Sequence, residues 1–319
     1  MKYDLLIVGS GPAGLSAAVY GKRANLKLAV AEKEYEGSGQ IAESGKVDNY
    51  LGLPGISGYD LGEKFREHAI SLGTEFIEKE VTQIELLFEE DGQKIGGYKL
   101  TFDDQTSAES RALIYAAGAY PKRAQIKGEE LYSGKGISYC AICDGAFCRG
   151  KNAAVLGGGD SALDDALYLS EIAEKVYLIH RRDSFRGAKS SLELVKSKKN
   201  IELILQETVE EFLGDKKLSA LRLGNGRILE VRAAFVAYGS LPQNEPVKEL
   251  VQLDTAGYII ASESGEAVNA ASGEILEGFY AAGDIRSKKL RQLVTAVSDG
   301  ANAATAAADY INQKGSKKE

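Results

Sequence analysis

Two stretches of the chain show the same order of apolar and polar positions. The first begins with the apolar run YDLLIV at Tyr3, turns at a glycine-rich segment at 9–14, continues at helical spacing and returns to an apolar run at Leu26–Ala31. The second, at 152–186, again has an apolar run, a glycine-rich turn, helical spacing and an apolar run that ends at His180. Short, continuously apolar runs are typical of buried parallel strands. The pattern therefore predicts two units of the form strand, turn, helix, strand.

The two units form an internal repeat with equal spacing. Gly9 precedes Glu32 by 23 positions, Gly157 precedes His180 by 23 positions, and the copies are offset by 148 residues. Strands that alternate with helices and carry a glycine-rich first turn are typical of dinucleotide-binding domains. We predict an α/β protein with two Rossmann-like, three-layer domains.

Each unit leads into a β-rich stretch that closes on a glycine. These stretches end in ALIYAAG at Gly118 and AAFVAYG at Gly239, and prolines that mark crossovers follow at 121 and 242. We therefore expect a discontinuous domain of residues 1–118 and 244–319, into which residues 119–243 are inserted. A helix rich in small residues follows Gly283, and we expect it to pack closely against a cofactor or the first domain.

The glycine-rich turns are predicted to bind pyrophosphate groups. Gly9 permits a tight turn, Gly11 lets the backbone approach the ligand, and Gly14 lets the helix pack against the strand. The two turns consist of Gly9, Gly11, Pro12, Ala13 and Gly14 in the first copy, and of Gly157, Gly159, Asp160, Ser161 and Ala162 in the second. Glycine-rich turns also occur for purely structural reasons, but here a strand precedes and a helix follows each one.

The residue that ends the second strand distinguishes the two copies. Glu32 can accept hydrogen bonds from both hydroxyl groups of an adenosine ribose. The second copy instead has His180, Arg181 and Arg182, and Arg186 follows. Guanidinium groups bind a 2′-phosphate, which a carboxylate would repel. The first site is therefore predicted to take FAD or NAD and the second NADP(H), with an exposed basic turn as the alternative for the second.

Composition limits the number of domains, the binding partners and the location that can be expected. The chain has 319 residues, of which 44% are hydrophobic, and is long enough for two domains. Its net charge of −7 provides no basic field for nucleic acid. No stretch reaches the roughly eighteen apolar residues of a membrane span, and the N-terminal run lacks the length and cleavage site of a signal peptide. We expect a cytoplasmic protein that binds neither nucleic acid nor membranes.

The motif CAICDG at 140–145 leaves a choice between metal ligands, a structural disulfide, inert buried thiols and a redox couple. A zinc site needs two further ligands, and the chain offers only Cys148 and two histidines without paired spacing. The position beside two dinucleotide sites favours a redox couple, and CxxC spacing lowers a thiol pKa. Asp144 is then a candidate proton donor or acceptor, or else an ordinary turn residue. We expect Cys148 to be a buried, unreactive thiol.

The order and spacing of five motifs resemble those of low-molecular-weight thioredoxin reductases over almost the whole chain. The motifs are GSGPAG at 9–14, CAICDG at 140–145, GGGDSA at 157–162, HRRDSFR at 180–186 and GDIRSKKLRQ at 283–292. The resemblance implies a cytosolic, homodimeric flavoprotein that uses FAD and NADPH to reduce thioredoxin and holds no metal.

The resemblance also implies roles for single residues. Cys143 is implied as the thiol nearer the flavin, Cys140 as the thiol that attacks the substrate disulfide, and Asp144 as the acid. The implied FAD contacts are Glu32, Gly39, Gln40, Asn49, Ala116, Ala117, Gly118, Gly283, Asp284, Arg291 and Gln292. The implied NADPH contacts are Ser161, His180, Arg181, Arg182 and Arg186.

Two departures from the family pattern stand out. Ser38 replaces a glycine, which is expected to put a side chain near the flavin wall. Lys288, Lys289 and Leu290 precede the Arg291–Gln292 pair. The positive charge of the two lysines is expected near the entrance of the flavin site.

The implied reaction passes electrons from NADPH through the flavin to the Cys140–Cys143 disulfide and then to thioredoxin. Because the cysteines and the NADPH motif share the inserted domain, we expect this domain to rotate about the crossovers near 118 and 243. One alternative is a reductase for another CxxC protein. Others are an NADPH-flavin oxidoreductase that reduces ferredoxin or oxygen without these cysteines, and a flavin-binding redox sensor without turnover.

Overall fold

The computed structural model describes residues 2–89, 92 and 94–316. The chain divides into two compact units. The first unit comprises Met1–Tyr120 and Leu241–Glu319, and the second comprises Pro121–Ser240. The two connecting segments contain the short strands β7 (Ala119–Pro121) and β16 (Ser240–Pro242), which pair with each other.

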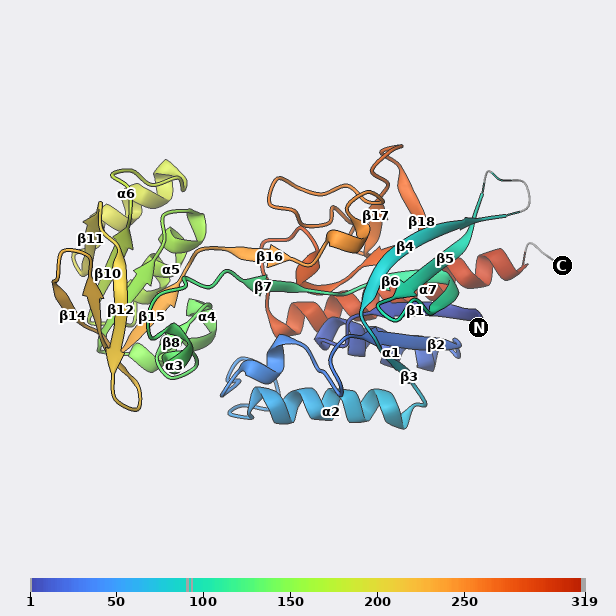
Figure 1. The fold of residues 1–319 in the computed structure, drawn as a ribbon, viewed down its shortest axis with the longest axis horizontal. Helices are drawn as coiled ribbons and strands as arrows, with labels where there is room; N and C mark the ends of the chain where they lie inside the picture. Colours follow the sequence, from blue (N-terminus) through green and yellow to red (C-terminus); the bar gives the residue numbers. More distant parts are fainter. Residues whose placement is uncertain (1, 90–91, 93, 317–319) are drawn as a thin grey trace. The chain divides into compact units, whose positions relative to one another are not determined.

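The first unit is built on a mixed sheet with a parallel centre (Figure 1). Five parallel strands lie in the order β18, β6, β1, β2, β3, with β17 antiparallel at one edge and β5 and β4 continuing from β6. The strands are β1 (Lys2–Val8), β2 (Leu28–Glu32), β3 (Glu75–Glu78), β4 (Val81–Phe88), β5 (Ile95–Phe102), β6 (Ser107–Tyr115), β17 (Glu266–Val268) and β18 (Ile275–Ala281).

Side chains alternate between the two faces of this sheet, and each face has its own core. Leu5 and Ile7 of β1 pack with helices α1 and α7, whereas Leu6 and Val8 pack with residues of β4 and β5 on the other face. The helices and 3-10 turns of the unit are α1 (Pro12–Arg23), η1 (Gln40–Glu43), α2 (Gly58–Ser71), η3 (Glu245–Val247), η4 (Gly283–Ile285) and α7 (Leu293–Ser316).

Helix α7 packs closely on α1, as its small residues predicted. A Cβ atom on Gly300 of α7 would lie 2.0 Å from the carbonyl oxygen of Ala13 in α1. The helices meet through alanines, among them Ala17 and Ala18 of α1 and Ala303 of α7. This close approach brings the Gly283 turn, which precedes α7, to the first glycine-rich turn.

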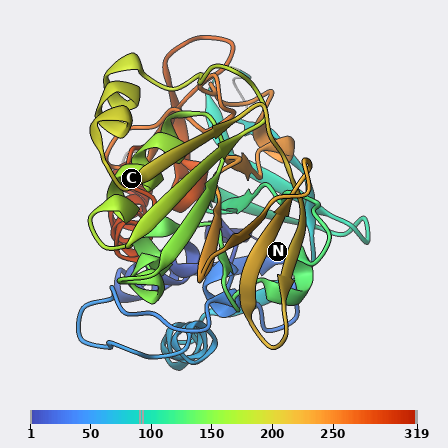
Figure 2. The same cartoon turned by 90° about the vertical axis from the view of Figure 1, so that its left-hand side faces the viewer.

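The second unit repeats the three-layer arrangement. Its parallel sheet has the order β11, β10, β9, β15, β8, and the green and yellow-green strands of this sheet are prominent in Figure 2. Val155 and Leu178 pack on the helical face, whereas Leu156 and Ile179 pack against an antiparallel sheet of β12, β13 and β14. The predicted fold class, with two three-layer Rossmann-like units, is confirmed.

The elements of the second unit are mostly short. Its strands are β8 (Ile137–Ser138), β9 (Asn152–Leu156), β10 (Lys175–His180), β11 (Ile201–Leu205), β12 (Val209–Gly214), β13 (Leu218–Leu223), β14 (Ile228–Glu230) and β15 (Ala233–Val236). Its helices are α3 (Glu129–Tyr132), α4 (Ala141–Asp144), η2 (Gly145–Cys148), α5 (Asp160–Ser170) and α6 (Lys189–Ser197).

Strand register places the predicted site residues at corresponding edges of the two sheets. Val8 pairs with Ala31, and Leu156 pairs with Ile179. Glu32 and His180 each come directly after the second residue of such a pair. In both units the glycine-rich turn and the strand-end residue therefore share the carboxyl edge, where open α/β sheets bind their ligands.

Candidate active site

The first glycine-rich turn is shaped by close backbone contacts. Gly9 has φ of +98°, and a Cβ atom there would lie 2.5 Å from the carbonyl oxygen of Ala116. A Cβ on Gly14 would lie 1.8 Å from the carbonyl oxygen of Gly9. Side chains at these two positions would clash with backbone, so the turn requires glycine. At Gly11, which precedes α1, an added Cβ would meet only Cα of Gly39 at 3.9 Å, so the backbone is far less crowded there.

Three other predicted segments gather around this turn. Ala116 donates its backbone N–H to Val8 at 2.8 Å, which puts residues 116–118 beside Gly9. A Cβ on Gly39 would lie 2.7 Å from Cα of Gly11. A Cβ on Gly283 would lie 2.8 Å from Cβ of Ala13. Segments far apart in the sequence thus form one cradle in the first unit.

Glu32 is fixed to this cradle through Ser10. Its Oε2 accepts hydrogen bonds of 2.8 Å from the backbone N–H and from the hydroxyl of the fully buried Ser10. Its Oε1 accepts a bond of 3.1 Å from the backbone N–H of Glu34. The carboxylate is therefore held at the strand end, in the position that suits a ribose hydroxyl pair.

The remaining flavin-site candidates form contacts across the first unit. Asn49 donates a 2.9 Å hydrogen bond to the side-chain oxygen of Gln292. Gln40 donates to the carbonyl oxygen of Ala119, and a Cβ on Gly118 would approach its amide. The Cζ atom of Arg291 lies 3.7 Å from the centre of the Tyr258 ring.

Two of the predicted flavin contacts each have a buried polar atom with no hydrogen-bond partner among the described residues. These atoms are Oδ1 of Asp284 and Nε of Arg291. Burial raises the pKa of Asp284, and the positive charges of Lys288 and Arg291 oppose this shift. Buried polar atoms normally find partners, so these two suit a polar ligand that carries hydroxyl and carbonyl groups. The residues present fit a flavin nucleotide.

Ser38 and Lys288, which belong to the two departures from the family pattern, are both largely buried. Ser38 is 5% exposed, and its hydroxyl lies against Gly62 of α2, where an added Cβ would be 2.3 Å away. Lys288 is directed inward to Asp299, at 2.9 Å, and its side chain is only 10% exposed. Lys288 is thus paired with an acidic residue of α7, whereas Lys289 is exposed. The charge expected near the entrance stays a prediction.

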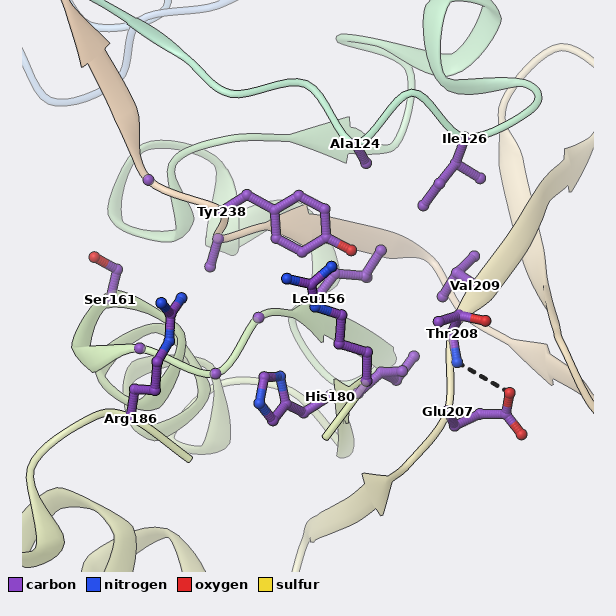
Figure 3. A pocket seen from close by; sticks show the side chains of 17 residues that line it. Ala124, Ile126, Leu156, Ser161, His180, Arg186, Glu207, Thr208, Val209 and Tyr238 are labelled. Atoms are coloured by element: carbon purple, nitrogen blue, oxygen red, sulfur yellow. Dashed lines mark hydrogen bonds between the residues drawn. The ribbon is translucent and has the colours of Figure 1, made fainter. Parts of the chain in front are cut away.

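The second unit contains a cavity of about 530 Å³ at the carboxyl edge of its sheet (Figure 3). A Cβ on Gly159 would meet nothing within 4 Å, whereas a Cβ on Gly158 would lie 2.2 Å from the His180 ring. Gly159 therefore leaves its backbone open to a ligand, and Gly158 packs inward. The sequence-predicted residues that line the cavity are Gly157, Gly159, Ser161, His180, Arg181 and Arg186.

The cavity carries positive charge from two arginines. Arg181 and Arg186 both line it, and neither forms an ion pair within the part of the chain that the structure describes. His180 is buried, donates from Nε2 to the carbonyl oxygen of Ser184 at 3.1 Å and stacks on Phe185. Burial lowers the pKa of His180, with the neighbouring arginines adding to the shift, so its ring is neutral near pH 7.

Three predicted contacts have other places in the structure. Arg182, Asp160 and Ala162 do not line the cavity. Asp160 accepts a 2.7 Å hydrogen bond from the backbone N–H of Ala188, and Ala162 is fully buried against Gly157. These two residues shape the turn from behind.

Sequence reasoning missed several lining residues. They are Ala124, Ile126, Leu156, Gly158, Ile179, Glu207, Thr208, Val209, Ala237, Tyr238 and Gly239. Glu207 and Tyr238 come just after the carboxyl ends of β11 and β15. The rule that ligands bind at this edge would have found these two once the strands were assigned.

Cys140 and Cys143 form a disulfide at the start of α4, with their Cα atoms 5.3 Å apart. The backbone N–H of Cys143 donates to Sγ of Cys140 at 3.2 Å. Cys143 is exposed and Cys140 is half-buried, so the pair can be reached by a reaction partner. The predicted pairing within CxxC is therefore confirmed.

Asp144 lies beside the disulfide and is held by Ser138. The Ser138 hydroxyl donates a 2.6 Å hydrogen bond to Oδ2 of Asp144. Burial raises the pKa of Asp144, and the bond from Ser138 opposes this shift. A carboxyl group with a raised pKa can hold and release a proton nearer neutral pH, which suits thiol chemistry.

Cys148 is a free, fully buried thiol, as expected. It donates to the carbonyl oxygen of Gly145 at 3.0 Å, and burial raises its pKa. Among residues 2–89, 92 and 94–316, no group of three or more His, Cys, Asp or Glu side chains could hold a metal ion. In the same residues, no helix is both long and apolar enough to cross a membrane.

Comparisons with known proteins agree with this site. A family model described as pyridine nucleotide-disulphide oxidoreductase matches residues 3–300. The chain is 38% identical to a thioredoxin reductase of Mycoplasma genitalium, with 97% of this chain and 95% of the relative covered. It is 36% identical to one of Bacillus subtilis, with 98% and 94% covered. A solved thioredoxin reductase of Streptococcus pyogenes matches with a TM-score of 0.89 at 34% identity, covering 98% of this chain and 99% of that one.

Proposed function

The chain belongs to the pyridine nucleotide-disulphide oxidoreductases, and we propose that it passes electrons from NADPH through FAD to the Cys140–Cys143 disulfide and on to thioredoxin. The observation that carries the proposal is the presence, in one unit, of an exposed disulfide and an arginine-lined nucleotide cavity. Thioredoxin enters as the substrate because the relatives at 36% and 38% identity carry that activity in their names.

The choice of NADPH over NADH rests on charge. Arg181 and Arg186 line the cavity without ionic partners among the described residues, which leaves both available to a 2′-phosphate. The neutral His180 ring adds packing and no charge. Of the other implied contacts, Ser161 lies on the cavity wall and Arg182 would act from outside it.

The choice of FAD rests on the first unit. Glu32 would accept from the adenosine ribose, and the turn at 9–14 would hold the pyrophosphate. Asp284 would accept a hydroxyl at Oδ1, which has no hydrogen-bond partner among the described residues. A bound flavin supplies the chemistry of accepting a hydride from the nicotinamide and passing two electrons to a disulfide.

The cysteines would then act by thiol exchange. In the reduced pair, the Cys140 thiolate attacks the disulfide of thioredoxin, one thioredoxin sulfur leaves, and a mixed disulfide forms. The Cys143 thiolate attacks Cys140 in that mixed disulfide, which releases reduced thioredoxin and restores the Cys140–Cys143 bond. Asp144 would supply the proton that a leaving thiolate requires.

The division of the chain suggests how both steps reach one flavin. We propose that residues 119–243 form the NADPH-binding domain, inserted into an FAD-binding domain of residues 1–118 and 244–319. The nucleotide cavity and the disulfide both belong to the inserted domain, whereas the flavin residues belong to the other. The inserted domain would therefore rotate about the connecting strands between half-reactions.

Anaerobic titration tests the proposal. Purified protein with FAD bound is titrated with NADPH or NADH while the flavin absorbance is followed, and oxidised thioredoxin is then added. We expect reduction by NADPH at a far lower concentration than NADH, followed by reoxidation with thioredoxin. Reoxidation by other CxxC proteins but by no thioredoxin would contradict the proposed substrate alone, and no reduction by NADPH would contradict the whole proposal.

A further inference from the structure

Glu129 is a buried carboxylate that is not among the predicted site residues. It lies in the short helix α3 of the second unit and is 3% exposed. A carboxylate removed from water needs hydrogen bonds to offset its desolvation. Its partners therefore show what holds it there.

Two of these partners belong to the wall of the nucleotide cavity. The backbone N–H of Ala124 donates to Oε1 of Glu129 at 2.9 Å, and that of Ile126 donates to Oε2 at 3.3 Å. Ala124 and Ile126 both line the cavity and lie across it from Ser161 and Arg186 (Figure 3). The carboxylate thus satisfies two backbone donors of the irregular segment that precedes the bridge between Lys127 and Glu211.

The third partner leads to the cysteines. The Tyr139 hydroxyl donates to Oε1 of Glu129 at 2.7 Å, and Tyr139 directly precedes Cys140. The preceding residue, Ser138, donates to Asp144 at 2.6 Å. Neighbouring side chains at the end of a strand point to opposite faces. The backbone that enters the CxxC motif is therefore held from one face by Glu129 and from the other by Asp144.

We propose that Glu129 is a positioning residue shared by both reactive sites of the second unit. One carboxylate holds the wall against which the nucleotide binds and, through Tyr139, fixes the residue that precedes Cys140. The inference rests on the proposed function, in which this cavity binds NADPH and the reduced cysteines carry out disulfide exchange.

Three substitutions separate the two roles. E129Q weakens both sets of contacts, because an amide offers one acceptor oxygen in place of two. Y139F removes only the link to the cysteines. E130Q is the matched control, since Glu130 is the adjacent, exposed residue of the same helix.

Two measurements on the FAD-loaded protein report the two sites. Binding of adenosine 2′,5′-bisphosphate, followed by calorimetry, reports the cavity without electron transfer. The rate of alkylation by iodoacetamide after reduction with dithiothreitol, followed as a function of pH, reports the cysteines. The pH profile gives the apparent pKa of the reacting thiol in folded molecules, which a loss of overall stability alone would not shift.

We expect E129Q to raise the dissociation constant of adenosine 2′,5′-bisphosphate about fivefold and to accelerate alkylation of the reduced cysteines about threefold. Y139F should give the same acceleration with a dissociation constant within about twofold of the unsubstituted protein, and E130Q should change neither. An unchanged alkylation profile in Y139F, or an unchanged dissociation constant in E129Q, would overturn the proposal. If E129Q does not fold, Y139F still decides the link to Cys140.

The outcomes also separate this inference from the proposed function. If the unsubstituted protein does not bind adenosine 2′,5′-bisphosphate, the proposed NADPH site is wrong. If it binds the compound normally but E129Q binds equally well, the proposed site stands and the shared role of Glu129 is wrong.

Discussion

The ammonium group of Lys288 lies 2.9 Å from Oδ2 of Asp299, and both side chains are only 10% exposed. Asp299, on α7, also accepts a 3.1 Å hydrogen bond from the backbone N–H of Gly283. Lys288 is 3.7 Å from Asp284 as well. The pair therefore joins α7 to the turn that carries Asp284, a proposed flavin contact.

Replacement of Lys288 tests this connection. Removing Lys288 takes away the shorter of the two ion pairs of Asp299 and leaves Arg286, 3.5 Å from its Oδ1, as the remaining cation, so the cost is about 1.5–3 kcal/mol. We expect K288M to lower the free energy of unfolding by about that amount and to accelerate loss of flavin on dilution. The matched control is K289M, because Lys289 is exposed and its loss should stay within about 0.5 kcal/mol. Urea unfolding measures both variants. Equal destabilisation would show that the Lys288–Asp299 ion pair does not stabilise the fold more than an exposed lysine does.

Adjacent glycines in the second turn offer a sharper contrast. A Cβ on Gly158 would overlap the His180 ring at 2.2 Å, whereas a Cβ on Gly159 would meet no atom within 4 Å. We expect G158A to destabilise the protein by about 1–3 kcal/mol, the usual range for overpacking. G159A should keep normal stability and weaken NADPH binding at least tenfold, because its methyl group would occupy the place proposed for the pyrophosphate. Thermal unfolding and nucleotide titration of both variants test this prediction. The reverse pattern would contradict the role of Gly158 in packing and of Gly159 in nucleotide binding.

Much of this site could be predicted because its constraints are local. A tight turn at Gly9 and a carboxylate at Glu32 are fixed by a few residues on either side, so their spacing in the sequence is informative. Arg181 and Arg186 were found in the same way, since Arg181 directly follows β10 and Arg186 comes shortly after it.

The remaining features depend on segments that meet only in the folded chain. Tyr238 reaches the cavity because β15 lies beside β9, and Lys288 turns inward because α7 carries Asp299. Glu129 belongs to no motif, and although its partners Ala124 and Tyr139 are only five and ten residues away, no pattern in the sequence marks these contacts. The homodimer and the cytoplasmic location stay predictions, as do the domain boundaries and the individual cofactor contacts.

Substitution of the cavity arginines tests the choice of nucleotide. A hydrogen bond to a charged group contributes about 1.5–3 kcal/mol, which corresponds to about 10- to 100-fold in affinity. We expect R181A to raise KM for NADPH by about that factor and to change KM for NADH less than threefold. R182A is the comparison, because Arg182 neighbours Arg181 and does not line the cavity, and its effect should be smaller. Equal losses for NADPH and NADH in R181A would argue against a 2′-phosphate contact.

Asp165 predicts a pH dependence of stability. Burial, together with the charge of Asp164, raises the pKa of Asp165 to about 7 from an ordinary value of 3.8. The folded state therefore favours the protonated acid, and this contribution is complete below about pH 4 and is lost as the pH rises to about 7. Each pKa unit corresponds to about 1.4 kcal/mol.

The variant D165N has no proton to lose and should escape this loss. Its free energy of unfolding, relative to the unsubstituted protein, should rise between pH 4 and 7 by at least about 2 kcal/mol and then stay level. D164N is the companion variant, since removing the like charge should lower the pKa of Asp165 and make the dependence shallower. Urea unfolding at a series of pH values gives the curves, and parallel curves for D165N and the unsubstituted protein would rule out the raised pKa.

Replacement of each cysteine by serine separates the roles proposed for the pair. In C143S, Cys140 can still attack oxidised thioredoxin, but no thiol remains to resolve the mixed disulfide. We therefore expect C143S to accumulate a covalent complex with thioredoxin and C140S to form none, while both lose turnover and keep NADPH-dependent flavin reduction. Gels run without reductant and stopped-flow absorbance of the flavin measure these outcomes.

The third cysteine serves as the control. Cys148 is fully buried and donates to the carbonyl oxygen of Gly145, so C148S should change neither the covalent complex nor turnover by more than about twofold. A covalent complex in C140S instead of C143S would exchange the roles of the two thiols. Turnover that survives in C143S would mean that electrons leave the flavin without this disulfide, as in an oxidoreductase that reduces ferredoxin or oxygen.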